Sequence, residues 1–266
     1  MGWLNALPGA IAQGIIWGIM AIGVYITYKV LDIADLTVDG SICTGAAVCT
    51  MLVISGVNVW LAMLAALAAG MAAGLLTGVF HTFMGIPAIL AGILTQLILW
   101  SVNLKILGKA NQALPARNFY VLVTQLKKTQ TLLVLAAVSI VLIAVLYWFF
   151  GTELGSSIRS TGCNISMSRA QGINTDFNKI LGLMLSNGIV ALAGALLAQY
   201  QGSADINMGR GAIVIGLAAV IIGEAVFSRI SRNFIVRLLG VICGGIIYYI
   251  VYQTVIFFGL DTDLLK

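Results

Sequence analysis

Few side chains in this sequence could carry out covalent chemistry, and they do not gather into a catalytic pattern. His81 is the only histidine, and it is accompanied by no Ser/His/Asp set, no His-Glu-x-x-His motif and no paired aspartates within an apolar run. The four cysteines lack metal-ligand spacing, so we interpret them as small apolar side chains. The sequence therefore predicts no catalytic residue and no metal site, and His81 is typical of a hydrogen-bonding residue at a helix end.

Composition predicts the elements that position these residues. Of 266 residues, 61% are hydrophobic and 9% are charged, whereas soluble domains carry about 25% charged residues. The apolar runs are continuous and do not alternate with period two, which indicates membrane-crossing helices instead of a barrel. We therefore predict an all-α polytopic membrane protein with about eight transmembrane helices. The predicted spans are roughly 10–30, 40–56, 59–80, 86–104, 131–150, 180–200, 211–228 and 234–258.

A polar stretch separates the two apolar parts of the chain: GTELGSSIRSTGCNISMSRAQGINTDFNK, residues 151–179. Glu153 suits the first turn of a short helix that Gly162 would end. Ser166 is the predicted cap of a second short helix that ends at Gly172, and Asp176 is the predicted cap of the next span. This pattern predicts two short helices on the membrane surface instead of a simple turn.

We interpret residues 151–179 as a cytoplasmic loop on which a soluble partner exerts force. Its predicted contact residues are Glu153, Ser157, Arg159, Gly162, Asn164, Arg169 and Gly172. The two arginines could pair with acidic groups of that partner. Binding to lipid phosphates at the membrane surface is the alternative.

Charge does not decide the orientation of the chain. With residues 151–179 inside, basic residues are equally frequent on both sides, so the positive-inside rule gives no answer. The net charge of +5 is attributed to loops near lipid headgroups, and no nucleic-acid partner is predicted. The outer basic residues either contact an acidic external partner or form a lipid-facing amphipathic segment. They are Lys105, Lys109, Arg117, Lys127, Lys128 and Arg210.

The chain also repeats itself. Ala34-Asp35-Leu36 matches Ala204-Asp205-Ile206, and the Gly-x4-Gly segment at 40–45 matches the one at 211–216. Five predicted spans separate the copies, so they should be inverted, with halves at about 10–80 and 180–258 of a single transmembrane domain, 1–266. Short, glycine-opened segments in both halves indicate a transport pathway or its hinges, whereas helix capping is the alternative role of the aspartates. The predicted pathway and hinge residues are Asp35, Gly40, Gly45, Thr95, Gln96, Asp205, Gly211 and Gly216. Glu224 is predicted to pair with Arg229 or Arg232.

Four segments resemble a known family: LDIADLTVDGSICTGAAV (31–48), NLKILGKAN (103–111), TELGSSIRSTGCNISMSRAQGIN (152–174) and LGLMLSNGIVALAGALLAQYQGSADINMGRGAIVIGLAAVIIGE (181–224). They are similar to the permease subunit of bacterial ABC importers of the branched-chain amino acid/ribose type, closest to the subgroup for tryptophan and other hydrophobic amino acids. Relatives carry a further hydrophobic helix after the segment resembling 259–266. The resemblance thus leaves the native C-terminus either naturally short or further along.

The resemblance implies a homodimer in the bacterial inner membrane, a cytoplasmic ATPase that docks on residues 151–179, and an extracytoplasmic substrate-binding protein. No Gly-x4-Gly-Lys-[Ser/Thr] motif occurs, so ATP and Mg are expected on the partner ATPase, with no cofactor and no enzymatic activity in this chain. The expected solute is a hydrophobic, aromatic or branched-chain amino acid. The alternative function is a secondary transporter of a small solute, which would need charged residues within the membrane for ion coupling.

Overall fold

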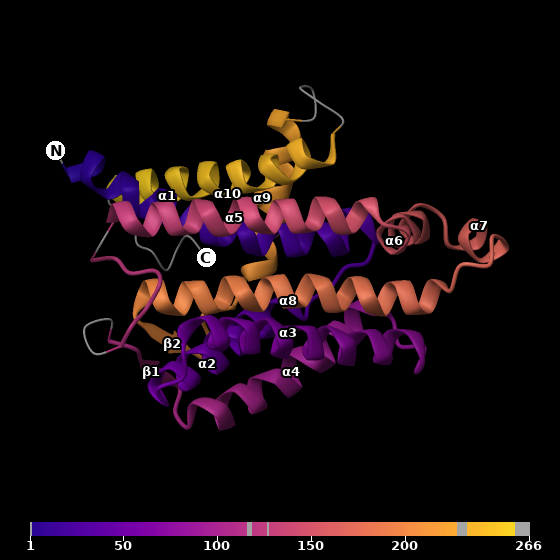
Figure 1. Cartoon of the computed structure of the whole chain (residues 1–266), viewed down its shortest axis with the longest axis horizontal. Helices are drawn as coiled ribbons and strands as arrows, with labels where there is room; N and C mark the ends of the chain where they lie inside the picture. Colours follow the sequence, from indigo (N-terminus) through magenta and orange to yellow (C-terminus); the bar gives the residue numbers. More distant parts are fainter. Residues whose placement is uncertain (1, 116–118, 127, 228–232, 259–266) are drawn as a thin grey trace.

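The computed structural model describes residues 2–115, 119–126, 128–227 and 233–258. Long helices that run roughly along one axis make up most of the molecule (Figure 1). The elements in chain order are α1 (Gly2–Tyr25), a π-helical turn η1 (Ile26–Val30), α2 (Val38–Ile54), α3 (Val59–Thr82), α4 (Ala88–Leu107), β1 (Asn111–Ala113), α5 (Lys128–Gly151), α6 (Glu153–Cys163), α7 (Ile165–Ala170), α8 (Thr175–Gln201), β2 (Ser203–Asp205), α9 (Ala212–Phe227) and α10 (Phe234–Phe257).

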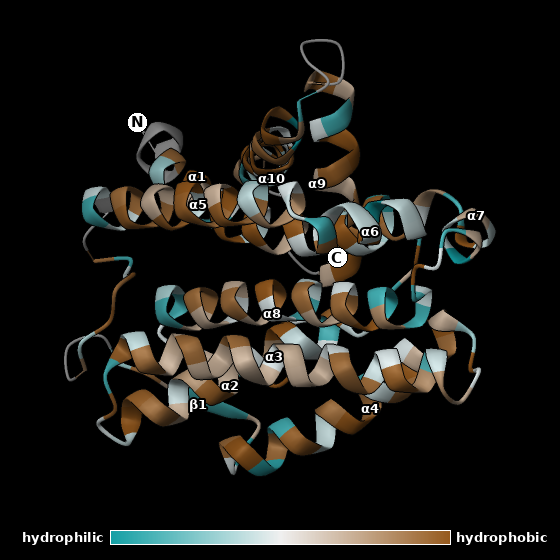
Figure 2. Cartoon of the chain, turned by 45° about the vertical axis from the view of Figure 1, so that its right-hand side comes forward, coloured by the Kyte–Doolittle hydropathy of each residue, from teal (hydrophilic) through white to brown (hydrophobic). Residues whose placement is uncertain are grey.

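The polytopic helical architecture agrees with the composition. Six of the described helices are long and apolar enough to cross a membrane, and Figure 2 shows hydrophobic residues along most of their length. The predicted spans at 40–56 and 211–228 correspond to α2 and α9, which have 17 and 16 residues. These two helices are shorter than the roughly 20 residues that a full crossing needs. Eight complete crossings therefore stay a prediction.

Two helices form the centre of the structure. In the apolar segments of α1 and α8, 83% and 72% of the residues are buried, against 22–39% in the other four candidate spans. Helix α1 packs against α10, α9 and α8, while α8 packs against α3, α2 and α1. The hydrophobic core therefore lies along the contact between these two central helices and their neighbours.

Glycine allows α2 and α8 to approach closely. A Cβ atom added at Gly45 would collide with the backbone of Ala191, and one added at Gly194 would collide with the backbone of Ile42. In lipid, the hydrophobic effect does not drive helices together. Van der Waals packing at close backbone contacts of this kind stabilises their association instead. We call this glycine-mediated contact the α2–α8 contact.

A short β-ribbon closes one end of the molecule. Strands β1 and β2 pair antiparallel, with Asn111 opposite Asp205. The ribbon lies at the end opposite α6 and α7 (Figure 1). This ribbon was not predicted, because two three-residue strands in separate loops leave no period-two pattern in the sequence.

Candidate functional site

The polar stretch folds into two short helices, as predicted, but α6 extends past its predicted end. Thr152 begins α6 by accepting a hydrogen bond from the Gly155 amide at 3.3 Å, and Glu153 lies in the first turn. The helix continues through Gly162 to Cys163. Gly162 therefore does not break α6. Its missing side chain makes room for the backbone of η1, because a Cβ atom there would collide with the Val30 carbonyl group.

Asparagine side chains cap the next two helices, in place of the predicted Ser166 and Asp176. Asn164 accepts a hydrogen bond from the Met167 amide at 3.0 Å and begins α7. Asn174 accepts one from the Phe177 amide at 3.1 Å and begins α8. Each lies three residues before the amide that it binds, which is the spacing of a helix N-cap. Gly172 follows α7 with a φ of +80°, in agreement with its predicted place at the end of that helix.

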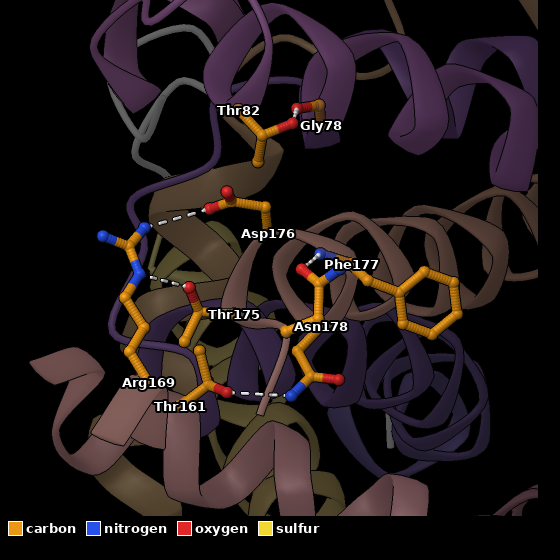
Figure 3. A network of polar contacts seen from close by, with 9 residues as sticks. Gly78, Thr82, Thr161, Arg169, Thr175, Asp176, Phe177 and Asn178 are labelled. Carbon is orange, nitrogen blue, oxygen red and sulfur yellow. Dashed lines mark hydrogen bonds and ion pairs between the residues drawn. The ribbon is translucent and has the colours of Figure 1, made fainter. Parts of the chain in front are cut away.

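Side-chain hydrogen bonds hold α7 against the start of α8 (Figure 3). The Arg169 guanidinium donates to Thr175 Oγ1 at 2.9 Å and to Asp176 Oδ1 at 3.3 Å. The hydroxyl groups of Ser160 and Ser168 lie 2.9 Å apart and join α6 to α7. Exposed ion pairs contribute only about 0.2–1 kcal/mol each, so the set of contacts fixes the loop more than any one pair does.

The buried Asn178 side chain ties α6 to α8 (Figure 3). Its amide nitrogen donates to Thr161 Oγ1 at 2.9 Å, and its amide oxygen accepts from the Ser157 hydroxyl at 3.2 Å. Arg159 donates to the Phe150 carbonyl at 2.6 Å. Arg159 and Arg169 therefore both contact their own chain, an arrangement that the sequence analysis did not consider. The predicted roles of the seven loop residues toward a partner stay predictions.

The outer surface of this loop is partly apolar. Ile165 and Met167 on α7 are 41% and 55% exposed, and Leu154 on α6 is 50% exposed. Helix α7 projects beyond the ends of the long helices (Figure 1). An exposed apolar patch bordered by polar residues is typical of a protein-binding surface. We call Leu154, Ile165 and Met167 the apolar tip.

The loop contacts the first part of the chain through η1. Beside Gly162, the η1 turn carries Lys29, whose ammonium group lies 3.0 Å from the Glu224 carboxylate on α9. The structure thus gives Glu224 a partner that the sequence analysis did not name. The predicted partners, Arg229 and Arg232, lie outside the described residues.

A buried polar network occupies the centre of the protein. Asp35 is 2% exposed, and its carboxylate accepts hydrogen bonds from Asn187 Nδ2 at 2.7 Å and from the Thr37 amide at 2.9 Å. The Ser41 hydroxyl donates to Asn187 Oδ1 at 2.6 Å. Asn187 therefore joins α8 to the turn before α2 and to α2 itself. A lone asparagine in an apolar run was a signal in the sequence that could have identified it.

Two other predicted pathway residues, Thr95 and Gln96, have different environments in the structure. Thr95 is fully buried and donates to the Ala91 carbonyl at 3.0 Å, within a chain of hydroxyl groups that includes Thr37 and Thr77. Thr95 therefore takes part in hydrogen bonding between helices, and its predicted role in lining a pathway stays a prediction. Gln96 is only partly buried and lines a cavity, described below.

The two repeat aspartates make the same local contact but do not cap a helix terminus through it. Asp35 accepts from the amide two residues ahead, and Asp205 does so from Asn207 at 2.7 Å. The start of α9 is capped by Asp39, whose carboxylate accepts from the Gly211 and Ile213 amides at 3.1 and 2.9 Å. The alternative role of Asp205 as the cap of α9 is therefore wrong. Asp39, from the other half of the chain, caps this helix.

The glycines of the two Gly-x4-Gly segments have different environments. Gly40 lies against α4, where a Cβ atom would be 3.0 Å from Leu99. Gly211 has a φ of +76°, and a Cβ atom added there would have no neighbour within 4 Å. Gly45 belongs to the α2–α8 contact, and Gly216 lies against α1, with a Cβ atom 2.8 Å from Val24.

The outer basic residues are only partly described. Lys105 and Lys109 are exposed near the end of α4, next to β1, and Arg210 is exposed in the turn before α9. Lys128 is the first residue of α5, while Arg117 and Lys127 lie outside the described residues. His81 binds the Ile86 carbonyl through Nδ1 at 2.9 Å, in agreement with its interpretation as a hydrogen-bonding residue at a helix end.

We expect Asn187→Leu to destabilise the protein by about 2–4 kcal/mol, because the buried Asp35 carboxylate keeps the Thr37 amide as a donor but loses that of Asn187, and the Ser41 hydroxyl loses the Asn187 oxygen as its acceptor. The measurement is the apparent melting temperature in detergent. The exchange variant Asp35→Asn/Asn187→Asp keeps donor facing acceptor and should recover part of the loss. Equal melting temperatures for Asn187→Leu and the unmodified protein would show that the network does not stabilise the fold.

These features define a class: a polytopic helical membrane protein with a braced, projecting loop that contacts both central helices. The chain belongs to the family described as the permease component of the branched-chain amino acid transport system, which matches residues 7–265. It is therefore a permease component of an ABC-type transport system and a multi-pass protein of the inner membrane.

Curated relatives agree with this family. The chain is 39% identical over 263 residues to the tyrosine transport system permease protein of Clostridioides difficile, covering 99% of this chain and 86% of the relative. It is 32% identical over 265 residues to an uncharacterized protein of Rickettsia prowazekii, covering 99% and 93%. It is 29% identical over 185 residues to the autoinducer 2 import system permease protein LsrC of Escherichia coli, covering 65% and 50%. No solved structure matches the chain.

Proposed function

We propose that this permease is the membrane subunit of an ATP-driven importer, and that α6 and α7 are its coupling element for a cytoplasmic ATPase. The observation that carries this proposal is a rigid, projecting loop with an apolar tip. Asn178 and Arg169 hold α6 and α7 on α8. A partner that binds Ile165 and Met167 would therefore move α8 together with the loop.

The same loop touches both halves of the chain. Helix α6 packs against η1, which continues α1, and against α8. Gly162 lies directly on the η1 backbone, so displacement of α6 acts on α1 by contact. Because α1 and α8 are the two most buried of the six candidate membrane spans, force applied at one loop reaches the centre of the protein from both sides.

The helix contacts support an inverted repeat. Helix α1 packs against α9 and α10, as α8 packs against α2 and α3, and α9 packs against α10 as α2 does against α3. Asp35 and Asp205 make equivalent turns before α2 and α9. We infer two inverted halves, α1–α3 and α8–α10, within a single transmembrane domain of about eight helices. Because the first helix of each half packs into the other half, the bodies that rock against each other would be α1 with α9 and α10, and α8 with α2 and α3.

The solute and the remaining partners follow by analogy. One relative is named for tyrosine transport, which favours a hydrophobic or aromatic amino acid. A binding protein would deliver it at the β-ribbon end, where Lys105 and Lys109 are exposed. A second permease copy would complete the pathway, while ATP and Mg would bind the ATPase and not this chain. Helix α4, with 28% of its apolar segment buried, offers a face for that copy.

Reconstitution tests this function. The permease and its ATPase are placed in proteoliposomes, the binding protein is added outside, and uptake of labelled L-tyrosine is measured. We expect uptake to require ATP, the ATPase and the binding protein, and to persist when a protonophore collapses the proton gradient. Uptake that follows the proton gradient without ATP or binding protein would contradict the proposal and identify a secondary transporter.

A further inference from the structure

A cavity of about 260 Å³ lies between α2 and α4, beside the turn that leads into α9. Helices α2 and α4 pack against each other in the lower part of Figure 1. The volume is close to the lower end of the roughly 300–1,000 Å³ range of small-molecule sites, which suits one amino-acid-sized solute. We call this space the α2–α4 cavity.

An unpaired buried carbonyl group marks this cavity. Asn103 lines it and is 1% exposed. Its amide nitrogen donates to the Gly40 carbonyl at 3.4 Å, but its amide oxygen has no hydrogen-bond partner in the described part of the chain. A buried acceptor without a donor destabilises a protein, so a small shift of the Asn103 side chain that turns this oxygen into the cavity would let a ligand supply the donor.

Charges of both signs lie on the same cavity wall. Arg210 is exposed there and makes no ion pair with any described residue. The Asp39 carboxylate accepts from the Gly211 and Ile213 amides at the start of α9, and a carboxylate has further lone pairs for another donor. A guanidinium group and a carboxylate beside one small cavity are complementary to a zwitterion.

The remaining wall is apolar and aromatic. Trp100 and Leu97 are 46% and 64% exposed, and Cys43 and Ile206 complete this side. The indole ring offers a flat face for an aromatic side chain, and aromatic pairs are favoured beyond the area that they bury. The cavity therefore combines an apolar wall with groups for both termini of an amino acid.

We propose that the α2–α4 cavity binds the transported solute as a zwitterionic amino acid with a large apolar side chain, preferably aromatic. Arg210 binds the carboxylate, Asn103 Oδ1 and Asp39 accept from the ammonium group, and the side chain lies against Trp100 and Leu97. The proposal rests on the proposed function for its assumption that the solute is an amino acid. It assigns Arg210 to the solute, whereas the sequence analysis assigned it to an external partner.

Binding to the purified permease in lipid nanodiscs tests the site. Labelled L-tyrosine is competed with L-leucine, with tyramine, which lacks the carboxylate, and with 3-(4-hydroxyphenyl)propionate, which lacks the ammonium group. We expect L-tyrosine to bind at least about tenfold more tightly than either analogue, because each analogue leaves one charged or buried group unpaired. Equal affinities for the three compounds would overturn the proposal.

Each variant should reduce one kind of discrimination. Arg210→Gln should bind L-tyrosine and tyramine about equally. Asn103→Leu should reduce, but not abolish, the preference for L-tyrosine over the propionate, because Asp39 still accepts from the ammonium group. In Trp100→Ala, the ratio of the affinity for L-tyrosine to the affinity for L-leucine should fall about fivefold. Variants that keep the unmodified pattern of affinities would show that these residues do not hold the solute.

Thermal stability separates a binding role from a structural one. Asn103→Leu removes an unpaired buried oxygen together with the 3.4 Å hydrogen bond to the Gly40 carbonyl, which still accepts from Thr44. Its melting temperature without ligand should therefore be close to that of the unmodified protein. The exposed Asn111→Leu, outside this cavity, is the matched control and should bind normally. A lower melting temperature of Asn103→Leu with unchanged binding would contradict the proposal.

The outcomes distinguish this site from the proposed function. If the unmodified permease shows the expected binding pattern but no ATP-driven uptake with its partners, the site stands and the transport proposal fails. If ATP-driven uptake occurs and the three variants bind and transport like the unmodified protein, the transport proposal stands and the site is overturned.

Discussion

With the Ile165→Asp/Met167→Asp permease, the rate of substrate-stimulated ATP hydrolysis in proteoliposomes should fall at least about 30-fold. The reason is that the partner ATPase would have to bury two charges at the apolar tip. Both side chains are exposed on α7, so the substitutions remove little packing within the permease itself. The amount of folded protein recovered from membranes should therefore remain unchanged. ATP hydrolysis by the assembled complex is the measurement.

A charge introduced elsewhere provides the matched control. Leu126 is 67% exposed in the segment that precedes α5, far from α6 and α7 in the chain. Leu126→Asp should leave stimulated hydrolysis within about twofold of the unmodified complex, since surface substitutions away from a contact have small effects. Full stimulation of the α7 double variant would place the ATPase contact elsewhere on the permease.

The Gly45→Leu permease should not fold. A side chain at this position meets the backbone of Ala191, which cannot rotate aside, so α2 and α8 would have to separate. Overpacking a tight contact typically costs about 1–3 kcal/mol, and a collision with backbone belongs at or above the upper end. The measurement is the monodisperse fraction of a fluorescent fusion after detergent extraction.

Two controls make this result specific. Gly151→Leu introduces the same side chain where a Cβ atom has no neighbour within 4 Å, and it should yield normal protein. Gly216→Ala meets the ends of the Val24 and Met20 side chains, which can shift, so its effect should be milder. Normal recovery of Gly45→Leu would show that the α2–α8 contact is looser than the structure has it.

Local pattern was enough to locate the long helices. Predicted spans at 59–80 and 131–150 correspond to Val59–Thr82 and Lys128–Gly151, because long apolar runs bounded by polar or glycine-containing turns have few alternative structures. The same holds for the two short helices of the polar stretch, whose composition changes sharply at both ends. Whether α2 and α9 cross the whole membrane could not be predicted, because their 17 and 16 residues are fewer than the roughly 20 that a crossing needs.

Contacts between distant residues explain what local pattern missed. Gly162 was assigned as a helix end because glycine weakens helices, yet its contact with Val30 requires a small residue inside α6. Asp39 caps α9 from the other half of the chain, and Asp35 binds Asn187 across a similar separation. No rule based on neighbouring residues can pair groups so far apart, although a polar residue in an apolar run indicates that some partner exists.

The position of the tight α2–α8 contact along α8 relates a displacement at the start of α8 to the angle by which this helix tilts. At about 1.5 Å per residue, Ala191 lies about 24 Å along α8 from Thr175, the first residue of α8 after the proposed coupling element. If the glycine contact acts as the pivot, a 4 Å displacement of the loop tilts α8 by only about 10°. Because Gly74 and Gly78 of α3 lie against the α8 backbone between these two points, α3 would have to tilt together with α8.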